Sequence, residues 1–383
     1  MNWNDLSRFR APLMGFAMII VMLFHVPLAH SDIFYGLMRC GNNGVDMFLF
    51  LSGIGLWFSW TKTHPLTPSK GTTHPLTPSR RDGELNSAQA GNNNPSLREG
   101  HRVGSSLRKG HRVGSFYCRR FLRLYPAWLI IACLYYIPQY WPNGGGYSPN
   151  IFHLIANILV GWSFWRIDDL TFWFVPAIMV LYLIAPFYMR LIQRDRTWRW
   201  LPVLMIVWYF LVRDWPPLWK AVGHVEIFWS RIPVFLLGIN AGELVKNPSL
   251  PPPRGRKDSS FFILHSSLIF LLSLWYCVYV EGHRHGAFPP AAERMVYIPL
   301  AVSAMFLMCK FFDHAPKWII RAFTFVGGIS LEIYLIHIQF VLVYIKPYHL
   351  GYWPTFLLML AISIPLAWLL SKLVSLLIKP LKK

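Results

Sequence analysis

The chain has 383 residues, of which 54% are hydrophobic and only 14% are charged. This composition excludes an ordinary soluble domain, and the long apolar blocks indicate an α-helical protein that crosses a lipid bilayer several times. Lysine and arginine outnumber the acidic residues by 37 to 17. This excess does not predict nucleic-acid binding, because most of the basic residues lie between apolar runs on one side of the predicted membrane topology.

Apolar runs with the length of membrane spans recur along the whole chain, and we predict ten of them. With the N-terminus in the cytoplasm, most lysines and arginines fall on the cytoplasmic side, which places both termini there. One further apolar segment, 151–165, is short and must have both ends outside, so we expect a re-entrant or interfacial helix. The predicted spans are 11–29, 44–61, 119–138, 172–191, 199–213, 228–246, 261–280, 292–312, 324–345 and 354–378.

His25 is the one ionisable side chain in the first apolar stretch, Ala11–Leu28, and lies near its outer end. An ionisable group inside a span is costly and therefore indicates a functional site. Asp46 begins the next apolar run at a matching depth. We predict that His25 is a general base oriented by Asp46. The alternatives are a packed, hydrogen-bonded histidine and a carboxylate that caps the N-terminus of its helix.

Residues 62–115 differ from the rest of the chain because they are polar and rich in Pro, Gly, Ser and Asn. Two segments are duplicated with a period of ten: 63–69 recurs as 73–79, and 96–105 recurs as 106–115 with one change. Such a segment cannot bury enough apolar surface to fold, so we predict a disordered cytoplasmic insertion. It divides one domain into the first two spans (1–61) and the remaining spans (116–383).

A group of arginines opens the third predicted span. Arg120 and Arg123 are three residues apart and share a helix face, and Arg119 lies beside them. Guanidinium groups bind phosphate oxygens through two parallel hydrogen bonds. The pattern favours a clamp for the phosphates of an anionic donor such as a coenzyme A. A membrane-interface anchor is the alternative.

Further charged side chains lie in the later spans. Arg231 opens the sixth span on the outer side, Glu332 falls in the middle of the ninth, and His337 lies above it. We expect Arg231 and His337 to converge with His25 and Asp46 on one outward-facing cavity. Alternatively, His337 forms an interhelical hydrogen bond and Glu332 pairs with a cation. The five cysteines show neither metal-type spacing nor a disulfide framework.

The order of these segments resembles the acyltransferase-3 family of integral membrane O-acyltransferases. The resemblance implies a ten-helix domain that transfers an acyl group, usually acetyl, from cytoplasmic acyl-coenzyme A to a carbohydrate hydroxyl. His25 matches the histidine of the family's first helix, and Arg120 and Arg123 match its Arg-x-x-Arg signature. The resemblance is carried by Ala11–His25, Gly44-Val45-Asp46 with Ser52-Gly53, Arg119–Pro126, Phe172-Trp173-Phe174, Arg231 with Phe235–Gly238, and Ser330–His337.

One position departs from the family pattern. The arginine that the family carries eleven residues before the histidine is Met14 here. Arg10 lies one turn earlier on about the same helix face, and we include it among the donor-binding residues.

We therefore predict an all-α, polytopic O-acyltransferase of the bacterial inner membrane, with acetyl-coenzyme A as donor and a cell-envelope or exported carbohydrate as acceptor. The bilayer and the carbohydrate are its expected partners, without a metal or nucleic acid. His25 would take the hydroxyl proton, with direct transfer or transient acylation of His25. The predicted catalytic residues are His25, Asp46, Arg231, Glu332 and His337, and the predicted donor-binding residues are Arg10, Arg119, Arg120 and Arg123.

Two other functions remain open at the level of the sequence. Buried ionisable residues also mark transport paths, so a transporter or flippase of a lipid-linked glycan is the main alternative. The absence of an evident inverted repeat speaks against it. A protein that senses acyl-coenzyme A and has lost catalysis is a weaker alternative, which Met14 permits.

Overall fold

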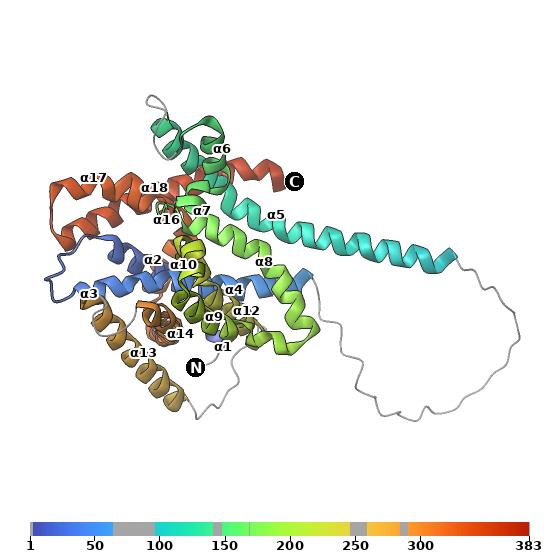
Figure 1. Cartoon of the computed structure of the whole chain (residues 1–383), viewed down its shortest axis with the longest axis horizontal. Coiled ribbons are helices and arrows are strands. Elements are labelled where there is room, and N and C mark those ends of the chain that lie inside the picture. Colours follow the sequence, from blue (N-terminus) through green and yellow to red (C-terminus); the bar gives the residue numbers. More distant parts are fainter. Residues whose placement is uncertain are drawn as a thin grey trace, which may run out of the picture.

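The computed structural model describes residues 3–63, 96–140, 148–167, 169–245, 259–283 and 290–382. Every regular element in these ranges is a helix, which confirms the predicted all-α class (Figure 1). The longer helices are α2 (Arg10–His25), α4 (Asn43–Thr63), α5 (Ser96–Tyr140), α6 (Ile151–Val160), α8 (Phe174–Arg194), α9 (Leu201–Asp214), α12 (Ile232–Leu244), α13 (Ser259–Gly282), α14 (Pro290–His314), α15 (Lys317–Gly328) and α18 (Tyr352–Ile378). The shorter ones are α1 (Trp3–Arg8), α3 (Tyr35–Arg39), α7 (Trp162–Ile167), α10 (Pro216–Val222), α11 (Glu226–Trp229), α16 (Ser330–Ile336) and α17 (Val343–Ile345).

The number of helices that can cross a membrane is smaller than predicted. Within the described ranges, seven helical segments are long and apolar enough, and an eighth is added if the pair 317–328 and 330–348, bent by 61°, counts as one span. The 16 residues of α2 and the 14 residues of α9 are about 24 and 21 Å long, below the ~30 Å of a bilayer core. The prediction of ten spans is therefore not confirmed, since 11–29, 199–213 and 324–345 are short or bent.

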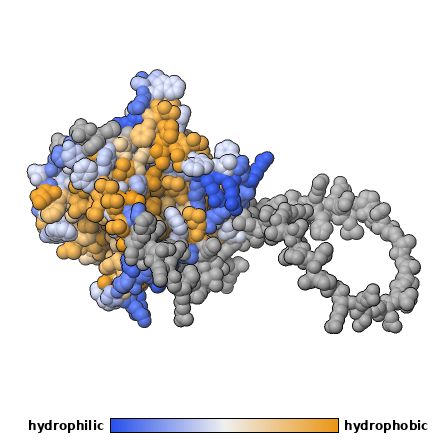
Figure 2. Space-filling view, turned by 90° about the horizontal axis from the view of Figure 1, so that it is seen from below, coloured by the Kyte–Doolittle hydropathy of each residue, from blue (hydrophilic) through white to orange (hydrophobic). Residues whose placement is uncertain are grey.

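The outer surface of the bundle is apolar over a wide area. Figure 2 shows a broad hydrophobic surface with hydrophilic residues at its margins. On α13, Leu264 is 66% exposed and Leu271 is 60% exposed, and on α18 Leu376 is 68% exposed. Apolar surface on this scale is stable against lipid chains rather than water, so the fold is that of a multi-pass membrane protein.

The predicted non-spanning segment 151–165 forms two short helices, α6 and α7. Gly161 separates them with φ of 63°, a left-handed conformation that glycine adopts readily. The buried side chain of Asn157 accepts the Ser163 N–H at 2.7 Å and donates to Ser148 Oγ at 2.8 Å. At ten residues, α6 is about 15 Å long and too short to cross a bilayer.

The segment expected to be disordered, 62–115, is described only in part. Residues 64–95 lie outside the described residues, and α4 continues to Thr63. Residues 96–115 form the first part of α5, and the disorder of the insertion stays a prediction. This duplicated stretch holds no proline and several good helix formers. Because it adjoins the helix of the third predicted span, helix can extend into it without a new nucleation step.

Close helix contacts hold the first helices in place. A Cβ atom on Gly15 of α2 would collide with the Phe323 carbonyl of α15, and one on Gly327 would collide with the Ala11 carbonyl. Small residues let two helix backbones approach this closely. The contact fixes α2 against α15 and thereby brings the C-terminal end of α2 beside the helix α16 that follows α15.

Candidate active site

Two histidines meet where α2 and α16 end. His25 Nδ1 lies 2.8 Å from the Val21 carbonyl oxygen and 3.3 Å from His337 Nε2. His337 Nδ1 lies 3.0 Å from the Ile333 carbonyl and 2.9 Å from the Tyr334 carbonyl. His337 is fully buried at the start of a π-helical turn, whereas His25 is half-buried. The structure thus brings together two histidines from opposite ends of the chain.

The carbonyl partners fix the proton on each neutral ring. A carbonyl oxygen only accepts, so Nδ1 of His337 carries the proton and its Nε2 is left as an acceptor. His25 Nδ1 also faces a carbonyl, so it carries a proton that the Val21 oxygen and His337 Nε2 share. The lone pair of His25 is consequently on Nε2, where it can take a proton.

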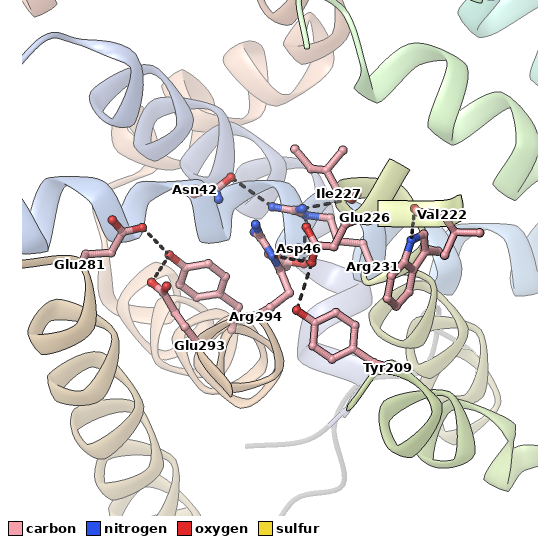
Figure 3. A network of polar contacts seen from close by, with 12 residues as sticks. Asn42, Asp46, Tyr209, Val222, Glu226, Ile227, Arg231, Glu281, Glu293 and Arg294 are labelled. Carbon is pink, nitrogen blue, oxygen red and sulfur yellow. Dashed lines mark hydrogen bonds and ion pairs between the residues drawn. The ribbon is translucent and has the colours of Figure 1, made fainter. Parts of the chain in front are cut away.

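Asp46 has a different partner from the one predicted. Its Oδ1 lies 3.5 Å from Nε of Arg231, and Arg231 also donates to Asn42 Oδ1 at 3.2 Å (Figure 3). Asp46 and Arg231 are each 1% exposed. The structure therefore joins Asp46 to Arg231 and His25 to His337, and the expected pair of His25 with Asp46 does not form.

Helix periodicity explains why Asp46 turns away from His25. On α4, Val45, Phe48 and Ser52 line a cavity beside α2. Gly53, seven residues after Asp46, packs against the Phe235 carbonyl of α12. Residues seven apart share a helix face, so Asp46 lies on the stripe that faces α12, whose N-terminus holds Arg231.

A second ion pair extends this buried network. Arg294 of α14 lies 3.6 Å from Glu226 of α11, and Tyr209 of α9 donates to the same carboxylate at 3.1 Å (Figure 3). These contacts hold α9, α11 and α14 together beside the Asp46 pair. Sequence reasoning missed Arg294 and Glu226. A signal for Arg294 was present, because it is a charged residue inside the predicted span 292–312.

An internal cavity runs along α2 from a group of arginines toward the histidines. It encloses about 730 Å³ of empty space, including its open mouth. Val21 and Tyr334 line its far end, one helical turn before His25 and His337 respectively. The remaining lining residues are Arg10, Met14, Val45, Phe48, Ser52, Arg120, Arg123, Leu124, Phe174, Ile178, Tyr182, Ser330 and Leu331.

The arginines of this cavity are held by backbone carbonyls of α4. Arg10 Nε donates to the Leu51 carbonyl at 3.1 Å, and Arg120 donates to the Gly55 carbonyl at 3.4 Å. Gly55 leaves room for Arg10, since a Cβ atom there would collide with its guanidinium group. Arg123 completes the group, whereas Arg119 is exposed and does not line the cavity. Three of the four predicted donor-binding arginines therefore converge.

Glu332 lies apart from the histidine pair. It is 8% exposed, interacts with Ser371 of α18, and is within electrostatic range of Arg123. Its position is thus toward the arginines rather than the histidines. Within the described ranges, no three His, Cys, Asp or Glu side chains gather in a way that could hold a metal ion.

Comparison with known proteins gives one finding. The family model described as an acyltransferase domain, of the acyltransferase-3 type, matches residues 13–372. This range contains the histidine pair, the buried ion pairs and all of the cavity lining except Arg10. Neither the curated proteins nor the solved structures contain a significant match to the chain.

Proposed function

Because the chain belongs to the acyltransferase-3 family, we propose that it transfers an acetyl group from cytoplasmic acetyl-coenzyme A to a carbohydrate hydroxyl on the outer side of the bacterial inner membrane. The observation that carries the proposal is the cavity, which has three arginines at one end and Val21 and Tyr334, each one helical turn before a histidine of the pair, at the other. An acyl donor that carries phosphates at one end and a thioester at the other needs cationic side chains and a base that lie far apart along its binding site.

The donor lies along α2 in this proposal. Its phosphates bind Arg10, Arg120 and Arg123 on the cytoplasmic side, because guanidinium groups match phosphate oxygens in geometry and charge. Arg10 and His25 are separated by fifteen positions of one helix, which is about 22 Å. The extended arm of the coenzyme then passes Met14 and Val21 and presents its thioester near His25.

The chemical step is direct transfer. His25 Nε2 takes the proton of the sugar hydroxyl while the hydroxyl oxygen bonds to the thioester carbonyl carbon. The carbonyl electron pair moves onto oxygen and then returns, and the carbon–sulfur bond breaks. The leaving thiolate takes the proton from His25, which regenerates the neutral ring, an acetyl ester and free coenzyme A. His337 keeps the reactive lone pair of His25 on Nε2.

Asp46, Arg231 and Glu332 act as positioning residues in this mechanism. Arg231 lies under the Trp173 ring, with its guanidinium carbon 5.0 Å from the ring centroid. Trp173 precedes Phe174, which lines the cavity. The Asp46–Arg231 pair thereby holds the N-terminus of α8 beside the histidines. Glu332 stabilises the position of Arg123 electrostatically at the arginine end of the cavity.

A groove beyond His25 is the proposed binding site for the acceptor. The rings of Trp275, Tyr279 and His283 stack along α13, with centroids 6.1 and 4.2 Å apart. Asp32 lines the same groove, whose empty space is about 660 Å³ including the solvent at its open side. Sites for small organic ligands combine aromatic walls with a few polar groups in this way. His30 also lines the groove, and its buried Nε2 atom has no hydrogen-bond partner among the described residues.

The groove is close enough to His25 to deliver a hydroxyl. His30 follows His25 by five residues, so the connecting chain spans at most ~18 Å. An oligosaccharide held between His30 and Trp275 can therefore extend one of its rings toward the histidine pair. Specificity for the glycan would then reside in the groove, and the chemistry in the histidines.

Trp275→Ala should weaken acceptor use without affecting the donor. Loss of an aromatic contact of ~0.5–1.5 kcal/mol predicts a KM for the glycan about two- to thirteenfold higher. Steady-state kinetics with varied glycan extract measure this, and calorimetry measures the affinity for acetyl-coenzyme A. Trp353→Ala is the matched control, because Trp353 is also exposed, at 57%, but lies outside the groove. Equal KM values in the two variants would remove the groove from the proposal.

Acetyl transfer by the purified protein tests the function itself. Protein in liposomes is given acetyl-coenzyme A labelled in the acetyl group together with a glycan extract of the host envelope. We expect label in the glycan and an equal amount of free coenzyme A. Movement of glycan across the bilayer, with neither binding of acetyl-coenzyme A nor label transfer, would instead indicate a transporter.

A further inference from the structure

Tyr334 places a hydroxyl group at the reactive end of the cavity. It lies on α16 one turn before His337, and the two ring centroids are 6.0 Å apart. Its hydroxyl oxygen accepts the backbone N–H of Phe174 at 3.2 Å. Its own O–H finds no acceptor among the described residues, although Tyr334 lines the cavity. The hydroxyl therefore has a proton to offer to a ligand.

The surroundings of this hydroxyl favour negative charge. Phe174 is the first residue of α8, a helix of 21 residues whose N-terminal N–H groups carry the positive end of the helix dipole. A phenol that accepts a hydrogen bond is polarised and becomes a stronger donor through its own proton. Arg231, on the other side of Trp173, is committed to Asp46 and Asn42 and does not compete for this position.

We propose that the Tyr334 hydroxyl donates a hydrogen bond to the thioester carbonyl oxygen and stabilises the oxyanion that forms there. This assignment rests on the proposed acetyl transfer. When the sugar oxygen bonds to the carbonyl carbon, the electron pair that moves to the carbonyl oxygen meets the O–H of Tyr334. When the carbon–sulfur bond breaks, the pair returns and Tyr334 keeps its proton. Tyr334 is thus a catalytic residue that neither gains nor loses a proton.

A purely structural role for Tyr334 would leave its proton unexplained. To cap α8, the hydroxyl needs only to accept the Phe174 N–H, and any acceptor would do. An O–H without a partner beside a largely apolar cavity is costly, and a donor shielded from water is expected to be paired. The carbonyl oxygen of the donor supplies that partner when the substrate is bound.

Tyr334→Phe tests the assignment because it keeps the ring and removes the hydroxyl. We expect kcat to fall about 100- to 1000-fold, as for the loss of one oxyanion donor, both in transfer to glycan and in hydrolysis of acetyl-coenzyme A by water. The Kd for acetyl-coenzyme A should change less than twofold. Tyr188→Phe is the matched control, since it removes a buried hydroxyl that donates to Asn240 at 2.8 Å, away from the cavity.

A second variant separates donation from packing. Site-specific incorporation of 3,5-difluorotyrosine at position 334 keeps the hydroxyl and makes it more acidic, so kcat should respond to the change in donor strength. A kcat that is unaffected in both Tyr334 variants overturns the inference. Hydrolysis needs no glycan, so it reports on Tyr334 even if the acceptor is wrong. A wild-type chain that neither hydrolyses nor transfers overturns the proposed function together with this inference.

Discussion

Replacement of His25 by alanine should abolish acetyl transfer while the protein remains folded in the membrane. In the proposed mechanism His25 Nε2 is the general base, and a positioned general base contributes about 10²- to 10⁴-fold to a rate. The packing that holds α2 runs through Gly15 and Gly327, two to three turns away, and is unaffected. The rate of label transfer from acetyl-coenzyme A, compared with the wild-type rate at saturating donor, measures the effect.

A matched histidine separates the chemistry from the helix contact. His314 makes the same contact one turn back, with Nδ1 3.0 Å from the Lys310 carbonyl, but it is exposed at the end of α14. His314→Ala should keep wild-type activity. His25→Asn gives a second comparison, because its amide can still donate to the Val21 carbonyl but cannot act as a base. Activity within tenfold of wild type in His25→Asn would rule out the proposed base.

His337→Gln should cause a smaller loss than His25→Ala under the same conditions, because His337 acts through His25. Its role is to accept the His25 Nδ1–H and so to keep the lone pair on Nε2. The Val21 carbonyl remains in place to hold the same proton at 2.8 Å. The ranking of these two variants therefore follows from the same tautomer assignment as the His25 prediction.

The sequence predicts which individual residues lie at the candidate site better than it predicts their partners. An ionisable residue in an apolar run stands out from the sequence alone, which is why His25 and His337 were singled out. Arg120 and Arg123 follow from spacing on one helix. Such signals are local, whereas a partner depends on which helix faces which. The sequence predicts that Asp46 and His25 lie at matching depths in the membrane. In the structure, however, the Asp46 side chain lies on the face of α4 that contacts α12 and pairs with Arg231.

The remaining differences have physical causes of the same kind. Tyr334 lies in the segment Ser330–His337 that carries the family resemblance, but it is one of 17 tyrosines and the sequence assigns its hydroxyl no role. Only the approach of Phe174 from α8 gives its hydroxyl a role. The bend of 61° between α15 and the segment that follows is also set by tertiary packing. Hydropathy predicts that a segment lies in the membrane, but it does not predict whether the helix of that segment is continuous or bent.

Replacement of Arg120 and Arg123 by alanine should remove most of the affinity for acetyl-coenzyme A. A hydrogen bond to a charged group contributes ~1.5–3 kcal/mol, so each substitution should raise Kd about 10- to 150-fold. Lysine at these positions should restore only part of the affinity, because an ammonium group cannot form two parallel bonds to one phosphate. Titration calorimetry of the detergent-solubilised variants measures each Kd. Arg194→Ala is the control, as an exposed arginine of α8 outside the cavity.

The donor itself supplies the sharper test of where the phosphates bind. Acetyl-pantetheine carries the thioester and the arm of acetyl-coenzyme A but lacks the nucleotide and its phosphates. If Arg120 and Arg123 bind those phosphates, replacing both arginines should weaken the binding of acetyl-coenzyme A. The much weaker use of acetyl-pantetheine should stay unchanged. The preference of the enzyme for the full coenzyme should then collapse in the double variant. An equal loss for both donors would show that the arginines support the cavity rather than bind phosphate, and the donor would have to enter by another route.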